Sequence, residues 1–155
     1  MKTRQLQQQG FSLVELLFVV AIVGIIATIA IPNLLASRQA ANESAAIASL
    51  RVVTSAEHTF FLTKGAGRYG SAAELRDADL IDSSLAGQGA GATGGQKSGF
   101  QYTITPGGSA SYTATAAAQG VLATRSFFVD ESGVIRYKKG DVPPDAATGT
   151  PIGGN

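Results

Sequence analysis

The 155-residue sequence contains no cysteine and no tryptophan, and it has one histidine. Without cysteine there is no disulfide, no thiolate metal site and no cysteine nucleophile. The lone His58 has no second ligand at metal-binding spacing, so we expect packing or surface hydrogen bonding there and no metal site.

Charge is scarce as well, because charged residues make up 15% of the chain and the net charge is +1. This balance gives no reason to expect a nucleic acid as partner. No carboxylate pair and no Ser/His/Asp order stands out, and one histidine limits acid–base chemistry. We therefore expect no catalytic residue and no cofactor, and an anchored enzyme is the least favoured class.

What the sequence does have is a long apolar block near its N-terminus. No charged residue occurs from Leu16 to Ser37, and about 20 apolar residues suffice for a helix to cross a bilayer. Lys2 and Arg4 precede the block and would hold the N-terminus in the cytoplasm. A removed secretory signal peptide is the competing interpretation, but it predicts a shorter apolar core with a small-residue cleavage site. The pattern favours a retained, single-pass membrane helix.

Glu15 is out of place at the start of this block. A carboxylate within a membrane span costs roughly 2.5–3.5 kcal/mol on insertion scales unless it is paired or reaches the interface. One interpretation is a side chain that extends to the lipid headgroups. The other is a carboxylate that pairs with a positive group, because a buried charge is tolerable only with a partner.

The residues around Glu15 resemble a known family. Gly10-Phe11-Ser12-Leu13-Val14-Glu15 follows a short basic leader and runs directly into the apolar block. This resembles the class III signal sequence of type IV pilins and of type II secretion pseudopilins. The resemblance implies that prepilin peptidase cuts between Gly10 and Phe11 and that the new amino group of Phe11 is methylated. It also implies that Glu15 pairs with that amine in a filament. The alternative interpretation of Gly10, without a cleavage role, is a simple loop residue.

Two helix breakers interrupt the apolar run. Pro32 lacks a backbone donor and clashes with the preceding turn, so we expect a bend or a local opening there. Gly24 and Pro32 both match the pilin pattern, in which the stretch between them loses helicity when subunits pack. The alternative for Gly24 is that it only allows close helix packing.

Beyond Pro32 the sequence stays compatible with a helix as far as Lys64, with Gly65 as a natural stop. Apolar residues recur at spacings of three or four and predict one buried stripe. The stripe consists of Ile47, Leu50, Val53, Ala56 and Phe60. A helix over 11–64 would be roughly 80 Å long at 1.5 Å per residue, with one half in the membrane and the other on a head domain.

The head begins with a short helical region. Ser71 and Glu74 form a capping-box pattern that predicts a helix over 72–77, followed by a turn or a second helical piece over 80–85. The glycine-rich stretch 87–99 lacks phosphate-loop spacing and predicts a flexible surface loop.

From Phe100 onward the period changes to that of strands. Alternation predicts strands over 100–104 and 111–117, joined by the turn Pro106–Ser109, and over 126–130 and 134–139 around a turn with Gly133. These four strands form an antiparallel meander. Asp130, Glu131 and Ser132 could be cation ligands, as in some pseudopilins, but three oxygen donors here are more often a plain turn.

The sequence thus predicts an α+β fold, a long N-terminal α-helix on a small four-stranded antiparallel sheet. The expected parts are a leader (1–10), a transmembrane and polymerisation helix (11–37), its amphipathic half (38–64), a head (65–139) and a mobile polar tail (140–155).

The resemblance implies a type IV pilus subunit, most like a major pilin without the C-terminal disulfide of many pilins. Such a subunit sits in the bacterial inner membrane and is then polymerised into a helical filament of identical subunits by the pilus assembly machinery, for motility, adhesion or DNA uptake. A pseudopilin, a minor pilin and a membrane-tethered binding module that never polymerises are the alternatives.

Overall fold

The computed structural model describes residues 11–108 and 110–153. The leader, with Lys2, Arg4 and Gly10, lies outside the described residues. The chain divides into two compact units, Met1–Ala36 and Ser37–Asn155. The helices are α1 (Leu13–Leu62), α2 (Ala72–Asp77), α3 (Ser83–Ala86) and the 3₁₀ turn η1 (Gly120–Leu122), and the strands are β1 (Gln96–Lys97), β2 (Phe100–Pro106), β3 (Tyr112–Ala118), β4 (Arg125–Asp130), β5 (Arg136–Lys139) and β6 (Thr150–Pro151).

Helix α1 runs for 50 residues through both units. Within the second unit it buries Leu50, Val53, Ala56 and Phe60 in the head core, which confirms most of the predicted stripe. The predicted Ile47 is only partly buried there, and its neighbour Ala46 is buried instead. The helix ends before Gly65, whose N–H donates to the carbonyl of Phe60 at 2.6 Å.

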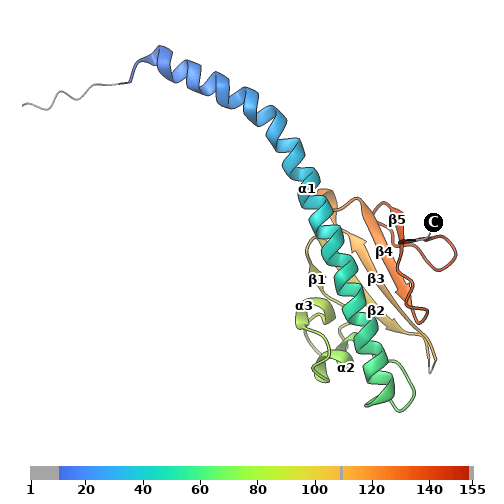
Figure 1. Cartoon of the computed structure of the whole chain (residues 1–155). Coiled ribbons are helices and arrows are strands. Elements are labelled where there is room, and N and C mark those ends of the chain that lie inside the picture. Colours follow the sequence, from blue (N-terminus) through green and yellow to red (C-terminus); the bar gives the residue numbers. More distant parts are fainter. Residues whose placement is uncertain (1–10, 109, 154–155) are drawn as a thin grey trace, which may run out of the picture. The chain divides into compact units, whose positions relative to one another are not determined.

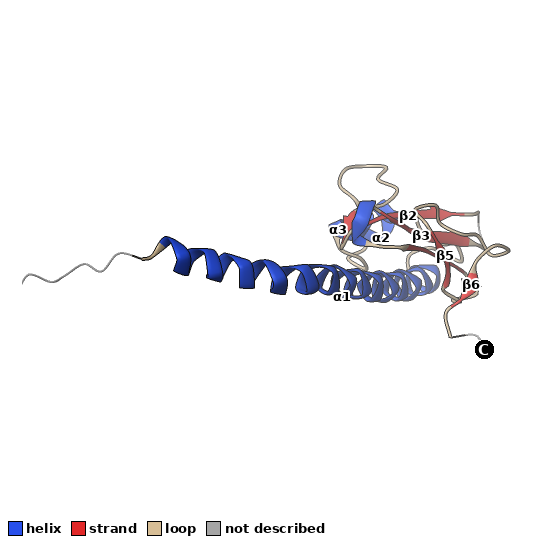
Figure 2. Ribbon diagram, turned by 90° about the horizontal axis from the view of Figure 1, so that it is seen from above, coloured by secondary structure: helices blue, strands red, loops and turns tan. Residues whose placement is uncertain are grey.

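The strands form one antiparallel sheet in the order β1-β2-β3-β4-β5-β6. In β2 the predicted alternation buries Phe100, Tyr102 and Ile104. The sheet packs on the head half of α1 through a single core, with α2 and α3 beside it (Figures 1 and 2). The α+β fold class is therefore confirmed.

The predicted count of four strands is wrong, because the sheet has six strands within residues 11–108 and 110–153. Strand β1 lies inside the glycine-rich stretch 87–99, which was expected to be a flexible loop. Its residues Gln96 and Lys97 pair with Gln101 and Phe100. Two glycines just before β1 are also packed, since the Gly95 N–H donates to the Leu85 carbonyl at 2.8 Å and a Cβ on Gly94 would strike β2.

The second additional strand, β6, lies in the segment 140–155 that was expected to be a mobile tail. Its residues Thr150 and Pro151 pair with Tyr137 and Arg136 of β5. Before β6 the Asp145 carboxylate accepts the N–H of Thr148 at 2.7 Å and closes a turn. This local structure comes from backbone pairing and a side-chain-capped turn, which an apolar pattern does not reveal.

The short helices follow their caps. The predicted capping box is present, with Ser71 and Glu74 satisfying each other's backbone N–H groups at the start of α2. The second helical piece lies later than the predicted 80–85, because Asp82 caps it and accepts the N–H groups of Ser84 and Leu85 at 2.8 and 3.1 Å. Helix α3 therefore begins at Ser83.

A buried carboxylate joins α1 to the start of β4. Glu43 is 5% exposed and accepts the Arg125 Nε–H and the Thr124 hydroxyl, each at 2.8 Å. Burial pushes the pKa of Glu43 up, but the hydrogen bonds from Arg125 and Thr124 outweigh it and leave that pKa below its ordinary value. This pair keeps the head half of α1 in register with the sheet.

Candidate assembly segment at the start of the long helix

The chain enters α1 through Phe11 and Ser12, which are described but not helical. The side chain of Phe11 is 81% exposed. The first turn closes when the Leu16 N–H donates to the Ser12 carbonyl at 3.2 Å, and Glu15 is the acidic residue of that turn. Of the predicted cleavage pair, only Phe11 therefore has a described structure.

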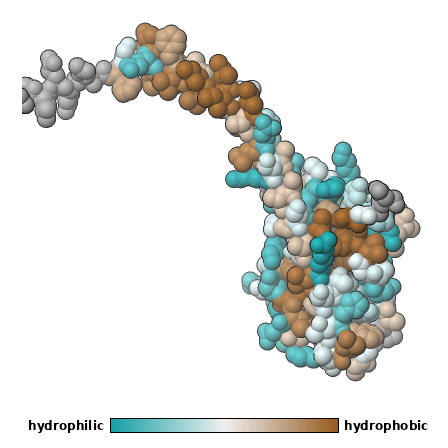
Figure 3. Space-filling view, viewed as in Figure 1, coloured by the Kyte–Doolittle hydropathy of each residue, from teal (hydrophilic) through white to brown (hydrophobic). Residues whose placement is uncertain are grey.

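The first unit presents apolar side chains on all sides of α1. The large apolar residues from Phe11 to Leu35 are between 39% and 81% exposed, and the most apolar 18-residue window of this helix has no buried residue. Figure 3 shows this part of α1 as an almost uninterrupted apolar surface. Helix α1 is long and apolar enough to cross a membrane. Signal sequences near an N-terminus share this length and composition. Such a surface needs lipid or other protein to cover it.

Glu15 is exposed at the beginning of this surface. Its place in the first turn lets it interact with the positive end of the helix dipole, worth about 0.3–1 kcal/mol. Within the described residues it makes no ion pair, and the sequence has no Lys or Arg between Phe11 and Ser37. The apolar half of α1 therefore supplies no positive side chain for Glu15.

Gly24 and Pro32 both lie inside α1, which is continuous across them. The opening expected at Pro32 does not interrupt the helix of a single chain. The loss of helicity between the two positions concerns the assembled filament and stays a prediction. A Cβ added to Gly24 would contact nothing within 4 Å, so nothing inside the described chain requires glycine there.

Two polar side chains of this segment bond to the backbone of α1. The Thr28 hydroxyl donates to the Gly24 carbonyl at 2.8 Å, and the Asn33 amide donates to the Ile29 carbonyl at 3.1 Å. Both bonds run four residues back along the helix, which is how Thr and other short polar side chains are accommodated in apolar helices.

The remaining candidate sites are ordinary structure. The Asp130 carboxylate accepts the Ser132 N–H at 3.0 Å, so the residues considered as cation ligands form a turn. His58 is exposed and packs edge-on to the ring of Tyr69 at 6.2 Å. In the described part of the chain, no group of three His, Cys, Asp or Glu side chains is placed to hold a metal ion.

Comparisons with known proteins agree with the geometry of the N-terminal segment. Residues 6–31 match the family model described as the prokaryotic N-terminal methylation motif. The chain is 41% identical over 58 residues to the "Type IV major pilin protein PilA" of Myxococcus xanthus, across 37% of this chain and 26% of that protein. It is 52% identical over 42 residues to the "Type IV wide pilus major component PilA4" of Thermus thermophilus, across 27% of this chain and 32% of that protein.

The chain thus spans about a quarter to a third of the length of these curated relatives. The predicted resemblance to type IV pilins is confirmed for the N-terminal segment. The family model ends at residue 31, so the description of the head rests on the structure.

Proposed function

We propose that this chain, whose N-terminal segment is that of a type IV pilin family member, is a structural subunit of a type IV pilus filament. The observation that carries the proposal is the uncovered apolar half of α1 with a single carboxylate at its start. Both named relatives are pilus components, described as a major pilin and a major component of a wide pilus. A subunit of this kind is a structural protein and not an enzyme.

The mechanism of assembly follows from burial. In the membrane the apolar half of α1 is covered by lipid, and outside it the same residues must be covered by protein. Apolar burial contributes roughly 25 cal/mol per Å², so packing such helices in a filament core is strongly favourable. Gly24, which no intrachain contact requires, offers a point of close approach between helices.

The other partners of such a subunit are prepilin peptidase and the pilus assembly machinery. Prepilin peptidase removes residues 1–10 on the cytoplasmic side of the inner membrane and frees the amine of Phe11, which is then methylated. Loss of Lys2 and Arg4 leaves ten basic and eleven acidic side chains. The head reaches the outer face of the membrane by the positive-inside rule, and the assembly machinery extracts the subunit into a surface pilus.

A pseudopilin or a minor pilin would use the same N-terminal segment. The designation of both relatives as major components favours a major pilin. A membrane-tethered binding module that never polymerises would also use the apolar half of α1, but it has no use for a carboxylate at the start of that segment.

Fractionation of cells that make the protein tests the proposal. Filaments sheared from the cell surface should contain this chain as their most abundant polypeptide, and deletion of its gene should remove them. Abundance at or below a few copies per filament would indicate a minor pilin. A chain confined to the membrane pellet would overturn the filament role.

A further inference from the structure

One acidic side chain of the head is buried and has no ion-pair partner in the part of the chain that the structure describes. Glu57, on the core face of α1, is 0% exposed. Its Oε2 accepts the N–H of Gly70 at 2.9 Å, across the connection between α1 and α2. Its Oε1 is buried with no hydrogen-bond partner among the described residues. An ionised carboxylate in this position would be stabilised by a single backbone bond.

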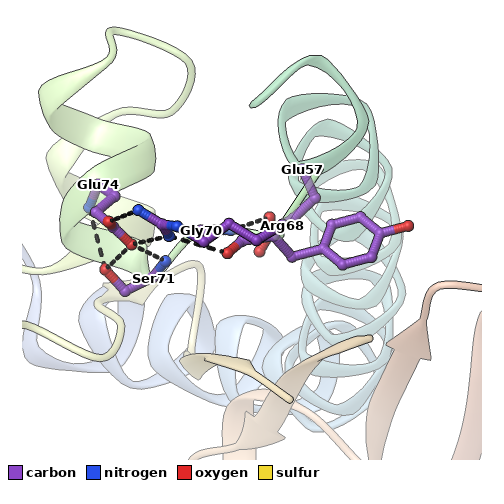
Figure 4. A network of polar contacts seen from close by, with 6 residues as sticks. Glu57, Arg68, Gly70, Ser71 and Glu74 are labelled. Carbon is purple, nitrogen blue, oxygen red and sulfur yellow. Dashed lines mark hydrogen bonds and ion pairs between the residues drawn. The ribbon is translucent and has the colours of Figure 1, made fainter. Parts of the chain in front are cut away.

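The connection carries two cations: Lys64, which is exposed, and Arg68, which is paired with Glu74. Both terminal nitrogens of Arg68 donate to Glu74, at 2.6 and 3.1 Å. Glu74 also accepts the N–H and the hydroxyl of Ser71 at 2.9 and 3.0 Å. Figure 4 shows this arrangement, with Arg68 directed toward Glu74 and Glu57 joined to Gly70. These contacts, with Arg68 first, lower the pKa of Glu74 to about 2, so its negative charge persists beside Glu57.

The other titratable groups around Glu57 do not help the ionised form. Tyr112 of β3 is buried, and its hydroxyl lies near the Thr54 hydroxyl without a hydrogen bond of normal geometry. Burial raises the pKa of Tyr112 to about 12, and Glu57 adds to that rise. Tyr69 lies against Tyr112 with ring centroids 4.9 Å apart, and His58 on α1 is exposed. Burial, opposed in part by the Gly70 N–H, raises the pKa of Glu57 to about 7.

We propose that Glu57 is a proton-dependent latch that closes the connection between α1 and α2 when its carboxyl group is neutral. The neutral acid leaves no charge in the core and keeps the bond from Gly70. The ionised form must either remain uncompensated or turn toward water, which opens residues 63–70. This inference concerns the head of a single chain and holds whether or not the chain polymerises.

The sign of the pH dependence follows from the raised pKa. The pKa of Glu57 in the folded chain lies above the ordinary value of 4.5 that it has in the unfolded chain. Its neutral carboxyl group therefore makes its full contribution to stability below pH 4.5. That contribution falls as the pH rises through about 7. Glu43 behaves in the opposite way, because its pKa is lowered. The head therefore has two buried carboxylates on α1 with opposite linkage to protons.

Hydrogen exchange of the full chain in detergent micelles tests the latch. After correction for the intrinsic exchange rate, the protection of residues 63–77 should fall by roughly tenfold to a hundredfold between pH 5.5 and 8.5. Glu57→Gln, which imitates the neutral acid, should remove that fall, whereas Glu43→Gln should keep it. Flat protection in the natural chain, or an undiminished fall in Glu57→Gln, would overturn the proposal.

A second measurement on the natural chain does not depend on the folding of a variant. The amide signal of Gly70 should shift with a midpoint near pH 7, together with one glutamate carboxyl carbon. If the Gly70 signal shows no transition between pH 5.5 and 8.5, Glu57 does not act as a latch.

Discussion

Replacement of Glu15 by Val is expected to reduce the yield of surface filaments at least tenfold while the subunit still accumulates in the membrane. The substitution removes the only charge from Leu13 to Ser37, so insertion into lipid becomes easier. In the proposed filament the same change leaves the amine of Phe11 without its partner, and an unpaired charge in an apolar core costs several kcal/mol. Filament yield is measured by shearing and quantitative immunoblotting of the sheared and membrane fractions.

Two further variants separate the charge from other roles of Glu15. Glu15→Gln keeps the length, the polarity and the first-turn position, and it should also lose filaments because the negative charge is gone. Thr28→Val lies in the same apolar half, where the Thr28 hydroxyl donates to the Gly24 carbonyl of its own helix, and it should assemble nearly normally. Unchanged filament yield in both Glu15 variants would exclude polymerisation through this ion pair.

Gly94→Ala is expected to destabilise the head by about 3 kcal/mol, the upper part of the range for overpacking. A Cβ at this position would lie 2.0 Å from the carbonyl oxygen of Tyr102 and 2.9 Å from the Cα of Thr103. All of its close contacts are with the backbone of β2 and cannot move aside as a flexible side chain would. The pairing of this stretch with β2 must therefore shift or break.

The measurement is urea unfolding of the full chain in detergent, followed by tyrosine near-ultraviolet circular dichroism. Ala90→Ser, at an exposed position of the same stretch, is the matched control and should stay within about 0.5 kcal/mol of the natural chain. A Gly94→Ala chain that unfolds together with the control would show that the stretch before β1 does not pack against β2.

The fold could be predicted from the sequence wherever side chains follow a period. The buried face of α1 was predicted from the spacing of Leu50, Val53 and Phe60. Strand β2 was predicted from the alternation of Phe100, Tyr102 and Ile104. Strands β1 and β6 could not be predicted in the same way. Each has two residues, and each exists because a neighbouring strand offers backbone groups to pair with.

The functional residues also differ in whether a local sequence pattern identifies them. Phe11 and Glu15 could be named because their chemistry is local and their pattern is contiguous. The contact between Glu43 and Arg125 joins residues 82 positions apart, and that of Glu57 with Gly70 depends on how the connection folds back. Sequence spacing does not encode such contacts.

A chain that is processed as a pilin and built into filaments changes its mass in a defined way. The most direct test is the intact mass of the polypeptide recovered from sheared filaments. We expect a chain that begins at Phe11, with the mass of residues 11–155 plus one methyl group. A polypeptide that retains Met1 and the leader, or one cut within the apolar half of α1, would contradict it.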